Sequence, residues 1–450
     1  LGFNRIKFTE QALKDLDSGL RKELGICLKI FSGDYQEVLK KIVTGIGGER
    51  VCLAYEYCSE PKIRDVEDAL EGWFGISESF RTISFPARHT LLDIEEVVGS
   101  KDYKKPNSMK DMERIFRRHF GVNSMGFYEV GDPLPVPNNS KPLADAYSSV
   151  SGLEISDLER IIMETYPGRS DNTQYFPGGE TEALERLRNK VTDRSQFVNE
   201  FRKPNTMSTN SEDDPREPST TGLSAYLSSG CLSIRMLWRE CESSYLSGSH
   251  TKPPESLHGQ MMFREMFYLL SRSVENWDSD VGNDSCIEVA WDDFDREKIM
   301  AWETGSTGYP YIDAMMRQLD ETGWMHHLGR HAVSCFLTRG QLWQNWTHGR
   351  DVFERKLVDS DWALNNGNWL WLAGVAPFSM PYYRIYNPCP DSKSSLNVET
   401  VNAEFIRYWV PELRSFPSKY IFEPHLAPIS IQKSAECMIG DDYPMPIVDR

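Results

Sequence analysis

Tryptophan is concentrated in one stretch of this 450-residue chain, because eight of the twelve tryptophans lie between Trp291 and Trp371. An indole is large and electron-rich, and its N–H needs a partner when it is buried. The same stretch holds Asp359, Asp361 and Asn365. So many indoles beside acids and amides predict a pocket for a large redox-active ring system. The alternative is an aromatic-rich helical core.

Composition describes a soluble globular protein of two or three domains, with 40% hydrophobic and 26% charged residues. No apolar run approaches the roughly 20 residues of a membrane span, so we expect no membrane association. Nine scattered cysteines without a CxxC pair indicate reduced thiols inside a cell. A net charge of −17 argues against non-specific coating of nucleic acid but permits a local basic cleft.

The first 110 residues alternate helix and strand patterns, which predicts an α/β domain with a parallel sheet. The expected helices cover 5–24, 35–46 and 63–75, and the expected strands cover 26–33, 50–57 and 79–85. Because the chain opens on a helix and without Met, we expect it to begin inside a longer protein. The sheet is then expected to lack its first strand.

Two further regions follow. Residues 111–175 are rich in Pro, Gly, Ser and Asn, which predicts a connector. Residues 176–450 carry helical patterns almost throughout, which predicts a large all-α domain. Within that domain the acidic, helix-poor stretch TNSEDDPREPST predicts a surface loop.

Hydroxyl side chains open one of these helices in the segment PSTTGLS, with the helix expected from about Leu223. The N–H groups of a helix N-terminus and nearby hydroxyls together form a ready anion site. Thr220, Thr221 and Ser224 are therefore candidates for a cofactor pyrophosphate. Ordinary helix capping is the alternative.

Gln260 and Arg264 lie four residues apart in GQMMFREMFYLL and so share one helix face. An arginine in such an aromatic helix reaches either an acid or a phosphate or flavin edge. The alternative is a surface ion pair.

His327 and His331 also share a helix face, within WMHHLGRHAVSCF. A zinc site would need further ligands, but the HExxH glutamate is absent and no third ligand lies nearby in the sequence, so we expect no metal. Paired histidines facing a cavity can exchange a proton near neutral pH. Satisfied core histidines are the alternative.

Two acids and two amides interrupt the aromatic helix DSDWALNNGNWLWL. Buried acids need partners, and Arg330 and Arg264 are the expected ones for Asp359 and Asp361. Gly367 is expected to leave room for the close approach of a ring.

These segments, together with TGYPYIDAMMRQL and FERKLVDSDWALNNGNWLWL, resemble the FAD-binding half of the photolyase/cryptochrome family. Within that family the chain is similar to the (6-4) photolyases and animal-type cryptochromes, on GGETEAL, RKPNT, PSTTGLS and HHLGRH. The resemblance implies an α/β domain followed by an all-α FAD-binding domain. It also implies an antenna chromophore, a deazaflavin or a folate, whose binding the missing first strand puts in question.

The resemblance assigns roles to individual residues. It implies that His327 and His331 protonate the (6-4) lesion and that Asn365 faces flavin N5. The residues expected to hold FAD are Thr220, Thr221, Ser224, Gln260, Arg264, Arg330, Asp359, Asp361 and Asn365. The expected electron-transfer chain is Trp369, Trp346, Trp291 and Trp343. The expected lesion and DNA contacts are Lys203, Gln260, Phe263, Trp371, Arg384 and Tyr386.

The chain departs from the family pattern at three other points. Phe263 stands where relatives usually carry Trp, which is expected to weaken stacking on a lesion. AGVAPF replaces a Ser-rich stretch, and His425 stands where the family has Trp.

Three functions are compatible with the sequence. The first is a light-driven enzyme that repairs (6-4) photoproducts in UV-damaged DNA, expected as a monomer in the nucleus, with cytoplasm or an organelle as alternatives. The second is a cryptochrome, a photoreceptor or clock regulator acting through clock or signalling proteins without repair. The third is a helical interaction protein that binds no flavin.

Overall fold

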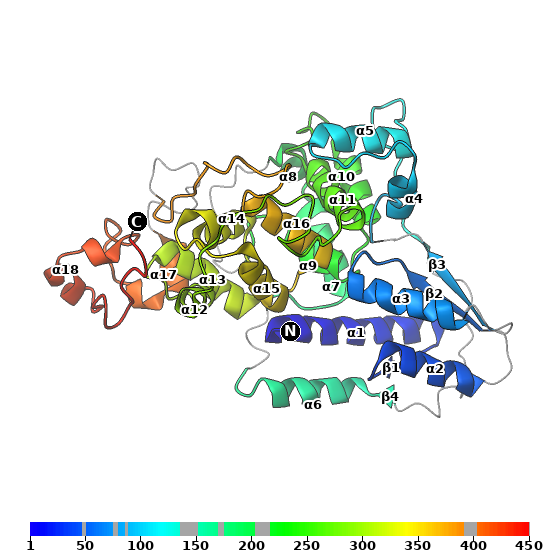
Figure 1. Cartoon of the computed structure of the whole chain (residues 1–450), viewed down its shortest axis with the longest axis horizontal. Helices are drawn as coiled ribbons and strands as arrows, with labels where there is room; N and C mark the ends of the chain where they lie inside the picture. Colours follow the sequence, from blue (N-terminus) through cyan, green and yellow to red (C-terminus); the bar gives the residue numbers. More distant parts are fainter. Residues whose placement is uncertain are drawn as a thin grey trace.

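The computed structural model describes residues 1–46, 51–74, 80–85, 89–135, 152–169, 175–202, 217–390 and 403–449. Helical segments dominate the chain after residue 175, and every strand among these residues lies before residue 154 (Figure 1). The α-helices are α1 (Phe3–Leu24), α2 (Tyr35–Ile46), α3 (Pro61–Phe74), α4 (Ile94–Gly99), α5 (Met109–Phe120), α6 (Ile155–Thr165), α7 (Glu180–Leu187), α8 (Ser195–Glu200), α9 (Ser224–Ser228), α10 (Ile234–Tyr245), α11 (Leu257–Ser273), α12 (Arg296–Thr304), α13 (Pro310–Thr322), α14 (His327–Cys335), α15 (Trp346–Lys356), α16 (Trp362–Leu372), α17 (Glu404–Trp409) and α18 (Ile429–Ser434). The strands are β1 (Ile30–Phe31), β2 (Val51–Glu56), β3 (Phe80–Phe85) and β4 (Gly152–Leu153), and short π or 3-10 turns are η2 (Arg188–Thr192), η3 (Phe336–Gly340), η4 (Pro411–Leu413) and η5 (Pro424–Leu426).

The N-terminal α/β domain is confirmed, with β2 and β3 pairing in parallel from Val51↔Phe80 to Glu56↔Phe85. Helix α3 packs on this pair and α2 packs on α3. A small apolar cluster around the buried Leu70, which includes Leu53 and Trp73, holds these elements together.

One predicted strand is wrong in its pairing. Within 26–33 only Ile30 and Phe31 form a strand, and it pairs antiparallel with β4 instead of joining the parallel sheet. The partner Gly152–Leu153 follows a long Pro- and Ser-rich stretch. Sequence periodicity could not reveal such a two-residue pairing, because two residues give no alternation to detect.

The stretch predicted as a connector carries ordered helices. Helix α5 overlaps its start, and α6 runs alongside α1 (Figure 1). Ser108 caps α5 by accepting from Asp111 N–H, and α5 packs on α11 through the buried Met112 and Phe116. The Phe116 ring also lies 5.8 Å from the ring of Trp238 on α10. The Pro- and Asn-rich composition of the stretch concealed these two amphipathic segments.

A single large core binds the helical domain to the segments before it. It extends from Phe8 on α1 to Tyr443 near the C-terminal end and includes Trp238, Trp302 and Trp369. Helix α11 lies at its centre and contacts α4, α5, α10 and α16. Among the described residues no helix is long and apolar enough to cross a membrane.

Candidate active site

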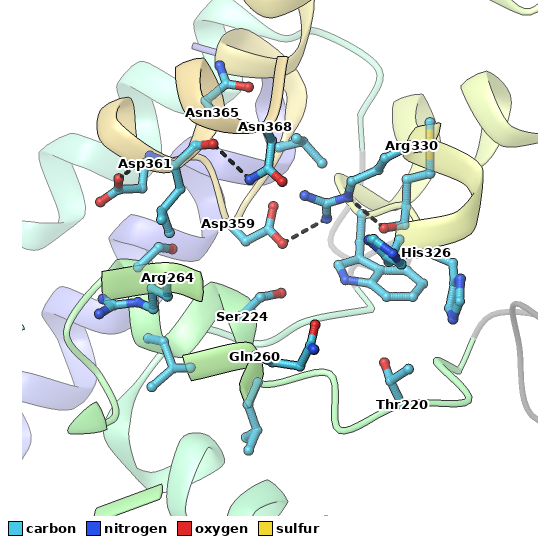
Figure 2. Close-up of a pocket in the computed structure, with 18 of the residues that line it drawn as sticks. Thr220, Ser224, Gln260, Arg264, His326, Arg330, Asp359, Asp361, Asn365 and Asn368 are labelled. Carbon is cyan, nitrogen blue, oxygen red and sulfur yellow. Dashed lines mark hydrogen bonds and ion pairs between the residues drawn. The ribbon is translucent and has the colours of Figure 1, made fainter. Parts of the chain in front are cut away.

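A cavity of about 360 Å³ opens between α9, α11, α14 and α16 (Figure 2). The side chains predicted to hold the cofactor all line it, although they come from four separate stretches of the chain. These residues are Thr220, Thr221, Ser224, Gln260, Arg264, Arg330, Asp359, Asp361 and Asn365. The volume lies in the range of small-molecule sites, which start at about 300 Å³.

Asp359 and Arg330 form the predicted ion pair at the cavity wall. Arg330 Nη2 donates to Asp359 Oδ2 at 2.7 Å, and Arg330 Nε donates to the carbonyl of Met325 at 2.9 Å. The other carboxylate oxygen, Asp359 Oδ1, is buried and has no hydrogen-bond partner within the described part of the chain. Asp359 lines the cavity, so a donor on a bound ligand is one way to satisfy this oxygen.

Asp361 is fixed through both of its oxygens. Oδ1 accepts from the N–H of Leu364 at 3.0 Å and so caps α16, while Oδ2 accepts from the phenol of Tyr268 at 2.7 Å. The expected direct pairing of Asp361 with Arg264 is wrong. Arg264 instead donates to Glu265 at 3.3 Å and to Tyr268 Oη at 3.2 Å, so it reaches Asp361 through one phenol.

The hydroxyls of the PSTTGLS segment face the cavity and do not cap the helix. Helix α9 begins at Ser224 as expected, but no side chain caps its first turn. Gly222, at φ +62°, turns the chain so that Thr220, Thr221 and Ser224 line the same wall. Three hydroxyls beside exposed backbone N–H groups suit an anion such as a pyrophosphate.

Asn365 is buried at the cavity wall, where its Nδ2 donates to the carbonyl of Arg350 at 3.0 Å and to Glu354 Oε2 at 3.3 Å. These two bonds fix the orientation of the amide. Gly367, on the same helix, was expected to leave room for a cofactor ring, and this expectation is wrong. A Cβ there would lie 2.5 Å from the ring of Phe267, so the close approach is to a core phenylalanine.

A second cavity of about 480 Å³ adjoins the first and shares Gln260, Arg264, His327 and His331 with it. The described residues predicted to contact the lesion all line this cavity: Gln260, Phe263, Trp371, Arg384 and Tyr386. Phe263 packs edge-on against Trp371 with ring centroids 5.4 Å apart. Lys203 lies outside the described residues.

The two histidines stand where the cavities meet. Their rings are 4.2 Å apart in an edge-to-face arrangement, as the four-residue spacing on α14 predicts. His331 Nδ1 lies 2.6 Å from Tyr386 Oη. Burial raises the pKa of Tyr386 to about 12, so this phenol is protonated at neutral pH. Two imidazoles this close, one of them bonded to a phenol, are able to exchange a proton with a bound group.

The four predicted electron-transfer tryptophans follow a gradient of exposure. Trp369 lines the first cavity and, like Trp346, is fully buried. They lie on α16 and α15, which pack together. Trp291 is partly buried and lies 5.4 Å from Trp343, which is 39% exposed. Exposure therefore increases from Trp369 at the cavity wall to Trp343 at the surface.

Sequence reasoning missed several residues of this site. His326 lines the first cavity and caps α14, because its Nδ1 accepts from the N–H of Leu328 at 3.1 Å. Trp324 and Phe353 also line it. Asn368, the second amide of the α16 segment, lines it too, although the sequence assigned it no role. Tyr268 could have been found, since it lies four residues after Arg264 on one helix.

Comparison with known proteins defines the class first. A family model described as the FAD binding domain of DNA photolyase matches residues 256–450, and one described as DNA photolyase matches residues 1–137. The protein is thus a flavoprotein whose cofactor is FAD. The unpaired Asp359 Oδ1 and the hydroxyl-lined wall of the first cavity fit such a ligand.

Individual relatives define the family. The chain is 38% identical to a (6-4)DNA photolyase of Arabidopsis thaliana over 99% of its own length and 76% of the relative's. It is 35% identical to Cryptochrome-1 of Sylvia borin over 100% of its length and 69% of the relative's. A solved cryptochrome structure from Synechocystis superposes with a TM-score of 0.78 at 24% identity, covering 100% of this chain and 86% of that one. The chain belongs to the photolyase/cryptochrome family.

Proposed function

We propose that this chain repairs (6-4) photoproducts in DNA under blue light. The observation that carries the proposal is the position of His327 and His331 on the shared wall of the two cavities. A group held there reaches both a bound cofactor and a substrate in the second cavity. Reduced FAD supplies, on excitation, an electron that the repaired bases return.

The protein's own residues supply binding and proton transfer. A lesion must leave the base stack to enter the second cavity, which costs a few kcal/mol and less for damaged bases. Phe263 and Trp371 offer an aromatic wall for it, and Arg384 offers a cation for the flanking phosphate. His331, oriented by Tyr386, or His327 gives the proton that accompanies return of the oxygen to its original base.

A cryptochrome role is the second candidate, because an exposed indole ends the tryptophan series at Trp343. An electron vacancy that reaches the surface can alter contacts with a protein partner, such as a clock or signalling protein. This candidate predicts photoreduction of the flavin without repair. For either role we propose that the protein is a monomer and acts in the nucleus. In the repair role its partner is UV-damaged DNA.

One experiment separates the two roles. The FAD-loaded, reduced protein is illuminated with a duplex that carries one (6-4) photoproduct, and the restored bases are quantified by chromatography. Repair in the light and none in the dark supports the enzyme. A duplex with a cyclobutane dimer is the specificity control. Lesion unchanged after illumination, with FAD demonstrably reduced, would reject repair and leave the photoreceptor role.

A further inference from the structure

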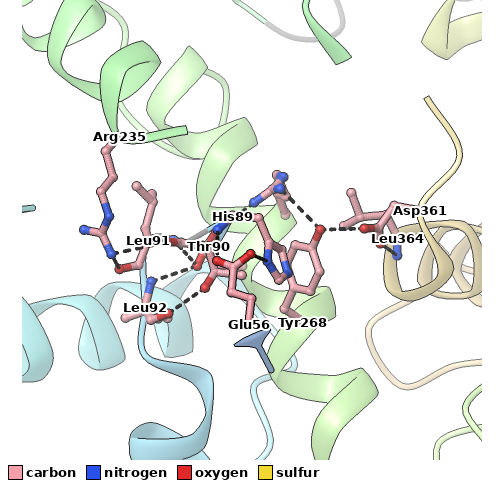
Figure 3. A network of polar contacts seen from close by, with 11 residues as sticks. Glu56, His89, Thr90, Leu91, Leu92, Arg235, Tyr268, Asp361 and Leu364 are labelled. Carbon is pink, nitrogen blue, oxygen red and sulfur yellow. Dashed lines mark hydrogen bonds and ion pairs between the residues drawn. The ribbon is translucent and has the colours of Figure 1, made fainter. Parts of the chain in front are cut away.

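A buried phenol outside both cavities controls the geometry of one cavity residue. Tyr268 is 4% exposed and lines neither cavity, yet its Oη donates to Asp361 Oδ2 at 2.7 Å (Figure 3). The same Oη accepts from Arg264 Nη2 at 3.2 Å. Because that guanidinium has only donors, the phenolic proton must point at Asp361. Burial raises the pKa of Tyr268 well above its usual value, so the proton stays in place at neutral pH.

The main chain just after β3 reaches this group from the N-terminal domain. Glu265 is fully buried and accepts from the N–H groups of Leu91 and Leu92 at 2.9 and 3.0 Å. From the other side Arg235 donates to the carbonyls of Thr90 and Leu91 at 3.3 and 2.8 Å. We call residues 89–92 the strap, and these two side chains hold its peptide groups on both faces.

The strap also contacts Tyr268 directly. The ring of His89 meets the ring of Tyr268 edge-on, with centroids 5.1 Å apart. Glu56, the last residue of β2, accepts from His89 N–H at 3.1 Å and lies 3.4 Å from His89 Nδ1. Figure 3 shows these contacts in one line, from the parallel sheet through His89 and Tyr268 to Asp361.

Two routes therefore join the α/β domain to the cofactor cavity. One runs from the strap through Glu265 and Arg264 to Tyr268, and the other runs through the ring of His89. Both end on the hydrogen bond that orients the Asp361 carboxylate. Contacts that only held the two domains together would not need Arg264 to bond both Glu265 and Tyr268. They would also not need the Tyr268 phenol to donate to Asp361, a residue of the cavity wall.

We infer that Tyr268 is a positioning residue for the FAD site, and that the strap lets the α/β domain tune the affinity and reduction potential of the flavin. The inference rests on FAD occupying the first cavity. Asp361 lines the cavity that would hold the flavin, and a carboxylate close to a flavin ring would disfavour the addition of an electron by its negative charge. Loosening Asp361 is therefore expected to weaken binding and to raise the potential.

The test measures the FAD dissociation constant and the flavin midpoint potential of the full chain. Tyr268→Phe removes only the phenolic oxygen and is expected to weaken FAD binding about tenfold, the scale of one hydrogen bond to a charged group. The potential is expected to become more positive. Tyr103→Phe is the control, because that partly buried phenol bonds Leu269 and Ser273 on α11, lines neither cavity and makes no contact with Asp361.

His89 provides the second arm. His89→Ala is expected to weaken FAD binding about threefold in the wild-type background. Loss of the His89 ring would loosen the Tyr268–Asp361 hydrogen bond without breaking it, so the effect is smaller than that of a whole bond. The same substitution should cause no further loss once Tyr268→Phe is present, because the phenol through which His89 acts is gone. His89→Phe, which keeps a ring against Tyr268, should restore the affinity.

The outcomes are distinguishable. If the wild-type chain fails to bind FAD, the flavin site itself is refuted, before any variant is compared. If the wild type binds FAD but Tyr268→Phe matches it in affinity and potential, the positioning role is refuted. An equal loss from His89→Ala in both backgrounds would show that the strap does not act through the phenol.

Discussion

His331 and Tyr386 are joined by a short contact, with Nδ1 and Oη 2.6 Å apart, across the boundary between α14 and the segment that follows α16. The two residues are 55 positions apart in the chain. The contact orients an imidazole at the meeting point of both cavities. It thereby connects one of the two proposed proton donors to the wall expected to bind the substrate.

Removing that phenol should slow repair without removing the cofactor. Tyr386→Phe is expected to lower the yield of (6-4) repair about tenfold, because a misoriented general acid loses part of its typical 10²–10⁴-fold contribution. FAD absorbance of the purified protein should not change. Tyr383→Phe is the control, since Tyr383 is 73% exposed. Equal repair by both variants would remove Tyr386 from the mechanism.

Trp369 should be required for photoreduction of oxidised FAD. Trp369→Phe is expected to abolish photoreduction in blue light with an external reductant, because the electron donor at the cavity wall is lost. Repair by chemically reduced protein should be nearly unaffected. Trp302→Phe is a matched control, because Trp302 is equally buried and lies 6.2 Å from Trp369 but does not line the cavity. Normal photoreduction in Trp369→Phe would refute the assigned chain.

Gly349 should be sensitive to a single added methyl group. A Cβ there would lie 2.1 Å from the Trp369 ring and 2.6 Å from Leu337. Gly349→Ala is expected to destabilise the fold by about 1–3 kcal/mol through overpacking and to slow photoreduction. Gly19→Ala on α1 meets nothing within 4 Å and should be neutral or stabilising in the same urea denaturation series. Wild-type stability in Gly349→Ala would contradict the packing.

His258 predicts a specific loss of stability in acid. Burial lowers its pKa to about 3, and its ring stacks on Trp238 at 3.6 Å. Between about pH 6.5 and pH 3, His258 is therefore protonated in the unfolded chain and neutral in the folded chain. Stability is fully present above about pH 6.5 and is lost as the pH falls toward 3, by roughly 1.4 kcal/mol per unit from this group.

His258→Phe should flatten that dependence. The free energy of unfolding is measured by urea denaturation at pH 7.5 and pH 5. We expect the wild type to lose about 2 kcal/mol more than the variant over this interval. The same comparison at pH 7.5 and pH 8.5 serves as the internal control, where both proteins should change alike. Identical acid profiles would mean that His258 is accessible to protons.

Much of the site could be predicted because its signals are local. The four-residue spacing of His327 and His331 placed both on one face of α14. The acids of the α16 segment required cationic partners, and Arg330 does pair with Asp359. The order of elements likewise predicted the α/β domain, since β2, α3 and β3 each carry a full periodic pattern.

The remaining features depend on contacts between residues distant in sequence. The β1–β4 pairing joins Ile30 to Leu153 through two residues only, too few for a periodic signal. Arg264 is an exception, because its partners Glu265 and Tyr268 lie one and four residues away on the same helix, and only the link from Tyr268 to Asp361 spans a long stretch of sequence. Gly367 faces Phe267, a contact that only helix packing could reveal.

The most direct test of the central claim compares the wild type with His331→Ala in single-turnover repair. Both proteins are loaded with FAD, chemically reduced, mixed with a (6-4) duplex and illuminated with blue light. We predict that the wild type restores the original bases and that His331→Ala binds FAD and the duplex equally but restores none. Equal repair by the two proteins, or no repair by the wild type, would contradict the account.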